Sequence, residues 1–128
     1  MISEKRKNGL RGEVLAARYL RQQGYQMVNG NYRTRLGEVD LMALDGEVLV
    51  FFEVKTRSPD SFGQPLDAVD YQKQRRVVAA AKQFIASRGY EGAVRFDVLE
   101  VRLHSDESGD IHHIPDAFEG EDLSYHGR

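Results

Sequence analysis

Two segments of the chain repeat apolar residues at the spacing of a helix face. Residues 6–23 carry one apolar stripe, and Gly24 follows where helices commonly end. A second stripe predicts another helix from about residue 67 to residue 88, which Gly89 ends. The stripes consist of Leu10, Val14, Ala17 and Leu20 in the first helix, and of Val69, Val77, Ala80, Ala81 and Phe84 in the second.

The other apolar segments predict five strands. Residues 25–34 form a strand with a polar interruption, and residues 37–57 form two strands around Asp45-Gly46, a strong two-residue hairpin signal. Residues 58–65 form a loop rich in turn residues. Residues 93–103 alternate as a strand, and residues 105–110 turn the chain toward a short strand at 111–115. The predicted order is therefore α-β-β-β-α-β-β.

This order predicts how the strands pair. The link between the third and fourth strands contains a helix, so these strands are expected to be parallel neighbours joined by a right-handed crossover. The hairpins on either side are expected to be antiparallel. We therefore predict an α/β domain in which helices flank a mixed five-stranded sheet.

Length and charge add limits to this picture. A chain of 128 residues suits one domain, predicted over residues 1–118, with an acidic, flexible tail over residues 119–128. The absence of cysteine excludes disulfides and thiolate metal sites. No apolar segment predicts a membrane span or a signal core, so a cytoplasmic location is expected by default. Residues 106–128 carry a net charge of −6 and residues 1–105 carry +4, which leaves a nucleic-acid partner open.

Residues 51–57, FFEVKTR, place Glu53 and Lys55 within a strongly apolar strand. If Asp45 and Gly46 form the turn, Asp40 faces Phe51, and Glu53 becomes a diagonal neighbour of Asp40 on the same face of the sheet. The backbones at such positions are roughly 7–8 Å apart. Two carboxylates this close repel unless a proton or a cation lies between them. Because Mg²⁺ is often held by one or two carboxylates and waters, the pair suits a site for Mg²⁺ or Mn²⁺.

Two further charged residues extend this cluster. Lys55 leaves the strand on the same face, where a lysine stabilises developing negative charge or orients an attacking water. Its alternative role is a salt bridge to Glu53 or Asp40. Glu13 lies within or beside the apolar stripe of the first helix, so its carboxylate needs a partner, either the metal cluster or a nearby Arg or Lys.

Asp40, the run Glu53-Val54-Lys55 and the upstream helical Glu13 together resemble the PD-(D/E)xK nuclease signature. The leading proline of that signature is absent, because Val39 precedes Asp40. More closely, the chain is similar to the uncharacterised bacterial YraN-type family, which itself resembles Holliday-junction resolvases. The similarity covers about residues 9–118 and rests on the segments GLRGEVLAARYLRQQGY, NYRTRLGEVDLMA and LVFFEVKTR, on the FGQP loop and on the helix after it.

The resemblance implies a restriction-endonuclease-like αβββαββ core and a role for each residue. Asp40 and Glu53 would bind the metal together with the Val54 carbonyl, Lys55 would be the catalytic lysine, and Glu13 would match the helical acid of the resolvases. The implied function is metal-dependent hydrolysis of phosphodiester bonds in DNA, with branched or structured DNA as a candidate substrate. The alternatives are a catalytically silent nucleic-acid-binding or scaffold module, and a hydrolase of small phosphates, which no glycine-rich phosphate loop supports.

Five basic residues near the ends of the flanking elements are candidate contacts to a nucleic-acid backbone: Arg35, Arg57, Lys73, Arg75 and Arg76. Lys73 falls on the apolar stripe of the second helix, where it either points toward the acids or a phosphate, or snorkels to solvent. For the arginines, an ordinary solvated surface charge is the alternative. Since junction resolvases pair two active sites, a homodimer is a further hypothesis, although no segment identifies an interface.

Overall fold

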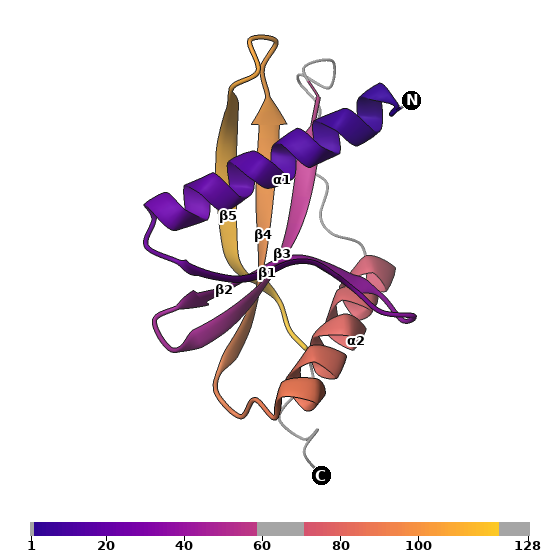
Figure 1. The fold of residues 1–128 in the computed structure, drawn as a ribbon, viewed down its shortest axis with the longest axis vertical. Coiled ribbons are helices and arrows are strands. Elements are labelled where there is room, and N and C mark those ends of the chain that lie inside the picture. Colours follow the sequence, from indigo (N-terminus) through magenta and orange to yellow (C-terminus); the bar gives the residue numbers. More distant parts are fainter. Residues whose placement is uncertain (1, 59–70, 121–128) are drawn as a thin grey trace.

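The computed structural model describes residues 2–58 and 71–120, which form one mixed sheet with a helix on each face (Figure 1). The sheet order is β1-β2-β3-β4-β5; β3 and β4 are parallel, and the other neighbouring pairs are antiparallel. The predicted α/β fold is confirmed, and it is consistent with a restriction-endonuclease-like core. The elements are α1 (Glu4–Gln22), β1 (Gln26–Arg33), β2 (Glu38–Asp45), β3 (Val48–Arg57), α2 (Tyr71–Arg88), β4 (Val94–Leu103) and β5 (Gly109–Phe118).

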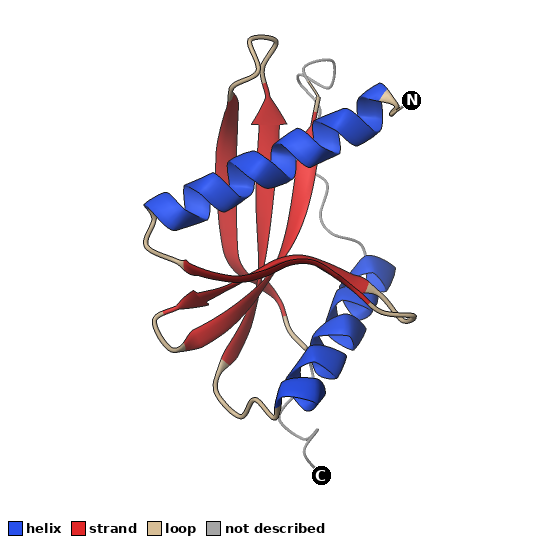
Figure 2. Ribbon diagram, viewed as in Figure 1, coloured by secondary structure: helices blue, strands red, loops and turns tan. Residues whose placement is uncertain are grey.

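Alternating side chains along β3 divide the core into two layers. Phe51 packs with Val77 and Phe84 of α2, whereas its neighbour Phe52 packs on the opposite face with Ala16 and Leu20 of α1. Burying one such large apolar side chain contributes about 1.5–3 kcal/mol, so the two layers hold both helices firmly on the sheet. Figure 2 shows α1 crossing the sheet, with α2 lying toward the other end of the molecule.

The predicted apolar stripe of α1 is wrong in part. Leu20 is fully buried, but Leu10 and Val14 are 46% and 57% exposed. The residues that α1 buries are Gly12, Ala16 and Leu20. A Cβ at residue 12 would lie 2.0 Å from Thr56 Oγ1, so the helix approaches β3 through its smallest residue. Close backbone approach, rather than maximal hydrophobicity, therefore selects the buried face.

The structure adds detail to the first and last strands, and several predicted segments lie outside the described residues. The polar interruption of the first strand is a bulge between Met27 and Asn29. The last strand is longer than the predicted 111–115, because β5 pairs with β4 from Gly109 to Phe118. The predicted first turn of the second helix at residues 67–70, the FGQP loop, and residues 121–128 of the tail lie outside the described residues. Neither α1 nor α2 is long and apolar enough to cross a membrane.

The hairpin between β2 and β3 turns one residue later than predicted. Asp45 pairs with Val48, so Gly46 and Glu47 are the central residues, and Gly46 adopts a φ of +60° that glycine tolerates readily. Partner positions shift by two: Phe51 pairs with Met42, and the predicted pairing of Asp40 with Phe51 is wrong. Because the shift is an even number of residues, Asp40 and Glu53 still share one face.

Asp97 is fully buried and joins β4 to β5. Its carboxylate accepts hydrogen bonds from Arg95 Nε at 2.8 Å and from the Asp116 backbone N–H at 2.9 Å, and it lies 2.7 Å from Nε2 of His113. Burial alone would raise the pKa of Asp97, but Arg95, Asp116 and His113 outweigh it and lower the pKa. Asp97, which alternates with apolar residues along β4, is therefore a structural hydrogen-bonding group.

Candidate functional site

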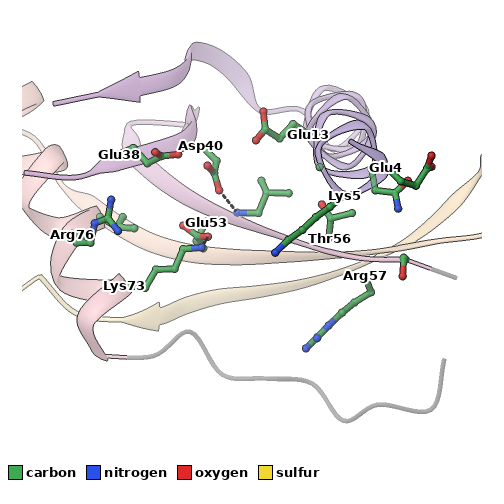
Figure 3. A pocket seen from close by; sticks show the side chains of 15 residues that line it. Glu4, Lys5, Glu13, Glu38, Asp40, Glu53, Thr56, Arg57, Lys73 and Arg76 are labelled. Carbon is green, nitrogen blue, oxygen red and sulfur yellow. Dashed lines mark hydrogen bonds and ion pairs between the residues drawn. The ribbon is translucent and has the colours of Figure 1, made fainter. Parts of the chain in front are cut away.

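A pocket of about 720 Å³ opens between the two helices, beside the end of β3 (Figure 3). The register pairs β3 with β2 as far as Phe52, whereas β4 accompanies β3 to Arg57. The second half of β3 therefore has a strand on one side and the pocket on the other. The lining residues are Glu4, Lys5, Asn8, Gly9 and Glu13 of α1; Glu38 and Asp40 of β2; Glu53, Val54, Thr56 and Arg57 of β3 with Ser58; and Lys73, Arg76 and Val77 of α2.

Asp40 and Glu53 form the centre of this pocket. Leu41 pairs with Phe52, so the next position outward along the hairpin brings Asp40 opposite Glu53 instead of diagonal to it. Oδ2 of Asp40 accepts a hydrogen bond of 2.8 Å from the backbone N–H of Val54. The two residues are only 7% and 2% exposed. The hairpin thus holds two carboxylates side by side in a largely buried position.

Burial raises the pKa of both carboxyls. For Asp40, desolvation is the largest cause and the charge of Glu53 the next; together they raise the pKa to about 7 against the smaller opposing effect of the Val54 N–H. Glu13 adds a weaker negative charge in the same direction. Desolvation also raises the pKa of Glu53, although Lys73 opposes it. The pair therefore favours a proton or a cation over two bare negative charges.

Lys73 supplies one positive charge to this pair. Its Nζ lies 2.8 Å from Oε2 of Glu53, and its side chain is 50% exposed. The aliphatic part of the Lys73 side chain therefore runs from the solvent-facing start of α2 to the buried carboxylate of Glu53. Burial alone would lower the pKa of Lys73, but the hydrogen bond and charge of Glu53 outweigh it, and the pKa is raised. Of the two orientations left open by the sequence, the structure has Lys73 pointing toward the acids.

Close backbone contacts set the walls of the pocket. Gly12 lets α1 approach Thr56, as described above. On the other wall, a Cβ at Gly37 would lie 1.9 Å from the backbone oxygen of Arg76, so the start of β2 packs directly on the backbone of α2. Both helices are thereby held against the strands that carry Asp40 and Glu53.

The other two predicted catalytic residues differ in their relation to the pocket. Glu13 is half-buried, lines the pocket from α1, and lies on the Asp40 side of the helix (Figure 3). Lys55 follows Glu53 on the same face of β3, and its charge is a minor cause that lowers the pKa of Glu53. Lys55 is not among the described residues that line the pocket. The structure brings Asp40 and Glu53 together, and the catalytic roles of Glu13 and Lys55 stay predictions.

The predicted nucleic-acid-binding residues fall into separate groups. Lys73 and Arg76 line the pocket from α2. Arg57 also lines it, but its Nε donates to Oε2 of Glu100 at 3.1 Å, and its side chain is only 13% exposed. Arg75 lies over the ring of Tyr71, and Arg35 is exposed in the turn before β2; neither is among the described residues lining the pocket.

Some residues that line the pocket were not predicted as site residues from the sequence. Glu38 alternates with Asp40 on β2, and its charge contributes to the raised pKa of Glu53, so strand alternation alone was a sufficient signal for it. Lys5 and Asn8 line the pocket from the first turns of α1. Their position depends on how α1 crosses β3, which the sequence pattern predicted only in part.

The donor set of the pair fits a divalent ion of the Mg²⁺ type. Within residues 2–58 and 71–120, no three His, Asp or Glu side chains converge as a ready-made metal cluster. Mg²⁺, however, is usually bound through one or two carboxylates and keeps several waters, for which the pocket has room. Asp40 and Glu53, two buried oxygen donors in need of a positive charge, are the residues that would hold it.

Comparison with known proteins connects this geometry to a family. The model of the family described as "Uncharacterised protein family UPF0102" matches residues 12–101, a span that includes Asp40, Glu53, Lys55 and Lys73. The chain belongs to this family. A UPF0102 relative from Chlorobium chlorochromatii is 47% identical over 115 residues, covering 86% of this chain and 89% of the relative. The predicted YraN-type family is thereby confirmed.

Two further UPF0102 relatives extend over most of their own length as well. The protein from Alkaliphilus oremlandii is 42% identical over 116 residues, which are 88% of this chain and 98% of the relative. The protein from Rhodococcus jostii is 44% identical over 111 residues, or 86% of this chain and 94% of the relative. These relatives carry only the family designation as their names, so the function of the site is argued from its geometry.

Proposed function

We propose that this UPF0102 protein is a metal-dependent nuclease that hydrolyses phosphodiester bonds in DNA. The observation that carries the proposal is the buried pair Asp40 and Glu53, which opens onto a pocket lined on one side by the cations Lys73 and Arg76. A buried acid pair of this kind has no use in a surface that only binds nucleic acid. The resemblance to PD-(D/E)xK nucleases supports the same reaction.

Hydrolysis of a phosphodiester forms a bond between the oxygen of water and phosphorus and breaks one ester P–O bond, whose oxygen takes up a proton. A divalent ion held at the site would polarise the phosphate and lower the pKa of a bound water. Asp40 and Glu53 would hold that ion, and the hydrogen bond from the Val54 N–H fixes the Asp40 carboxylate. Lys55 offsets charge in the transition state, and Arg76 contacts the phosphate from α2.

The substrate class proposed is DNA, with branched or structured DNA included because of the likeness to junction resolvases. A homodimer and a cytoplasmic location belong to the same proposal. Arg57 is expected to contribute less to DNA binding than the sequence predicts, because its guanidinium is hydrogen-bonded to Glu100.

A catalytically silent nucleic-acid-binding module is the second candidate. One observation favours it: the described residues offer two converging carboxylates and no third ligand side chain. The two candidates share the basic wall at Lys73 and Arg76 but differ in whether the acid pair is required for turnover. A test must therefore separate binding from cleavage.

The test is a cleavage assay on duplex, flap, single-stranded and four-way-junction DNA with Mg²⁺ or Mn²⁺. Wild type is compared with Asp40→Asn and Glu53→Gln, which keep the side-chain shapes, and with Lys55→Ala. The control is Asp110→Asn, an exposed position at the start of β5 and outside the lining of the pocket. We expect wild type and the control to cleave at least one substrate, and the pair variants to bind DNA without cutting it. Binding without cleavage by wild type would support the silent module, and cleavage that survives both pair variants would contradict the proposal.

A further inference from the structure

The ammonium of Lys73 lies where a divalent ion would neutralise the acid pair. It is 2.8 Å from Oε2 of Glu53, and the charges of Glu53, Asp40 and Glu38 all act on it. Figure 3 shows the Lys73 side chain reaching from α2 to Glu53. Lys73 thus has an electrostatic part in the structure that contact with nucleic acid does not require.

A metal ion and this ammonium compete for the same carboxylate. Mg²⁺ binds carboxylate oxygens at about 2.0–2.1 Å and needs near-octahedral surroundings. The ammonium at hydrogen-bond distance from Oε2 takes one of the directions needed for such a shell, and two cations a few ångströms apart repel strongly in a partly buried pocket. Metal binding at the pair therefore favours movement of the ammonium away from Glu53.

The structure gives Lys73 a place to move to without rearranging α2. Its side chain is half-exposed and unbranched, so it can swing by changes of rotamer. The helix backbone is held at Arg76 by the close approach of Gly37. Arg76, one turn along α2, lines the same pocket, so a lysine released from Glu53 would lie beside another cation, on the wall where a phosphate would bind.

We infer that Lys73 is an internal counter-ion that occupies the acid pair before the metal arrives, and that the metal displaces its ammonium toward the phosphate of the substrate. The inference rests on the proposed function, since it assumes that a divalent ion binds at Asp40 and Glu53. It makes Lys73 a positioning residue that couples metal binding to substrate binding. Lys73 acts in opposite directions in the two binding steps: its charge weakens metal binding to the acid pair and strengthens binding of the substrate phosphate.

The test is a calorimetric titration of Mn²⁺ into the full chain at about pH 8, above the pKa of about 7 of Asp40, without DNA. The variant is Lys73→Met, which keeps the length of the side chain and removes the charge. Lys82→Met, farther along α2 and outside the lining of the pocket, is the matched control, and Lys73→Arg restores the charge. DNA affinity of the same proteins is then measured with Ca²⁺ in place of Mn²⁺.

We expect Lys73→Met to bind Mn²⁺ more tightly than wild type, roughly fivefold, because removal of a partly exposed ion pair frees Glu53. The same variant should bind DNA several-fold more weakly, whereas Lys82→Met should match wild type in both titrations and Lys73→Arg should restore the weaker metal binding. Equal or weaker Mn²⁺ binding by Lys73→Met, with wild type binding the ion, would overturn the inference and leave the proposed function intact. An absence of Mn²⁺ binding by wild type would instead contradict the proposed function.

Displacement of Lys73 has a second readout that does not depend on the stability of Lys73→Met. The NMR signals of the Lys73 ε-methylene and ammonium in wild type should shift when Mg²⁺ is added, while those of Lys82 stay in place. Unchanged Lys73 signals at a Mg²⁺ concentration that saturates the site would also overturn the inference.

Discussion

The Asp40 carboxylate accepts a hydrogen bond of 2.8 Å from the backbone N–H of Val54, the residue directly after Glu53. This contact fixes the acid of β2 against the acid of β3, although both are nearly buried and would repel when ionised. The pair is therefore a local source of instability that a bound cation would relieve. Its electrostatics can be measured without knowledge of the substrate.

The raised pKa of Asp40 predicts how stability depends on pH. An Asp in an unfolded chain titrates near pH 4, whereas burial and Glu53 raise the pKa of Asp40 to about 7. Between these values the folded state holds a proton that the unfolded state has lost, so stability from this group falls as pH rises from about 4 to 7. Asp40→Asn should remove this penalty and be more stable than wild type by about 1–3 kcal/mol at pH 8.

Urea unfolding of wild type and Asp40→Asn at pH 4.5 and pH 8 checks this expectation. Asn keeps an oxygen acceptor for the Val54 N–H, so the substitution changes the charge while conserving the contact. The difference between the two proteins should be much smaller at pH 4.5. A difference that is the same at both pH values would show that the Asp40 carboxyl titrates normally.

Gly12 is predicted to be intolerant of a methyl group. A Cβ at this position would lie 2.0 Å from Oγ1 of Thr56, so Gly12→Ala should push α1 away from β3 and destabilise the protein by about 1–3 kcal/mol. Gly9, in the same helix, has nothing within 4 Å of an added Cβ, and Gly9→Ala should stabilise by up to about 1 kcal/mol. Thermal denaturation of the two variants tests the pair, and similar effects at both positions would contradict the packing described for α1.

Asp97 is predicted to serve stability and not the reaction. Asp97→Asn removes the buried carboxylate that contacts Arg95 and His113, leaves Arg95 with only the exposed Asp45 as a charged partner, and should cost about 3 kcal/mol at neutral pH. The folded pKa of Asp97 is lowered, so its carboxylate stabilises the wild-type protein at pH values above the pKa of an unfolded Asp. This stabilisation is lost as the pH falls below about 4, and the cost of Asp97→Asn should shrink there. Unfolding curves at pH 7 and pH 3 measure this, and metal binding by the folded variant should equal that of wild type.

Arg76 is predicted to contact a DNA phosphate, whereas Arg88 at the far end of α2 is not. Arg76→Gln should weaken DNA binding and reduce the slope of log affinity against log salt concentration by about 1. Arg88, whose guanidinium lies over the ring of Phe84, provides the matched control through Arg88→Gln. An unchanged slope for Arg76→Gln would place the DNA-binding surface elsewhere.

The sequence predicted the sheet well because its signals are local and strong. The Gly-containing turn at residues 45–47, the helix between β3 and β4 and the alternation of side chains are enough to order and orient the strands. The predicted hairpin register differs from the observed one by two residues, because Gly46 could belong to a turn centred on residues 45–46 or on residues 46–47. The even size of the error preserved the faces and hence the acid pair.

The parts that the sequence predicted poorly depend on tertiary contacts. The face that α1 buries is set by the approach of Gly12 to Thr56, and nothing in the periodicity of Leu10 and Val14 indicates it. The engagement of Arg57 by Glu100 joins residues far apart in the chain, as does that of Lys73 by Glu53. Such pairings decide which basic residues are available to a substrate, so charge counts alone misjudge them.

The most direct measurement of the central claim is a Mn²⁺ titration of wild type and Asp40→Asn followed by calorimetry at about pH 8. If Asp40 and Glu53 hold the ion, wild type should bind one Mn²⁺ per chain at this site, and Asp40→Asn should lose that binding while staying folded. Equal Mn²⁺ binding by the two proteins would contradict the claim that this acid pair is the metal site.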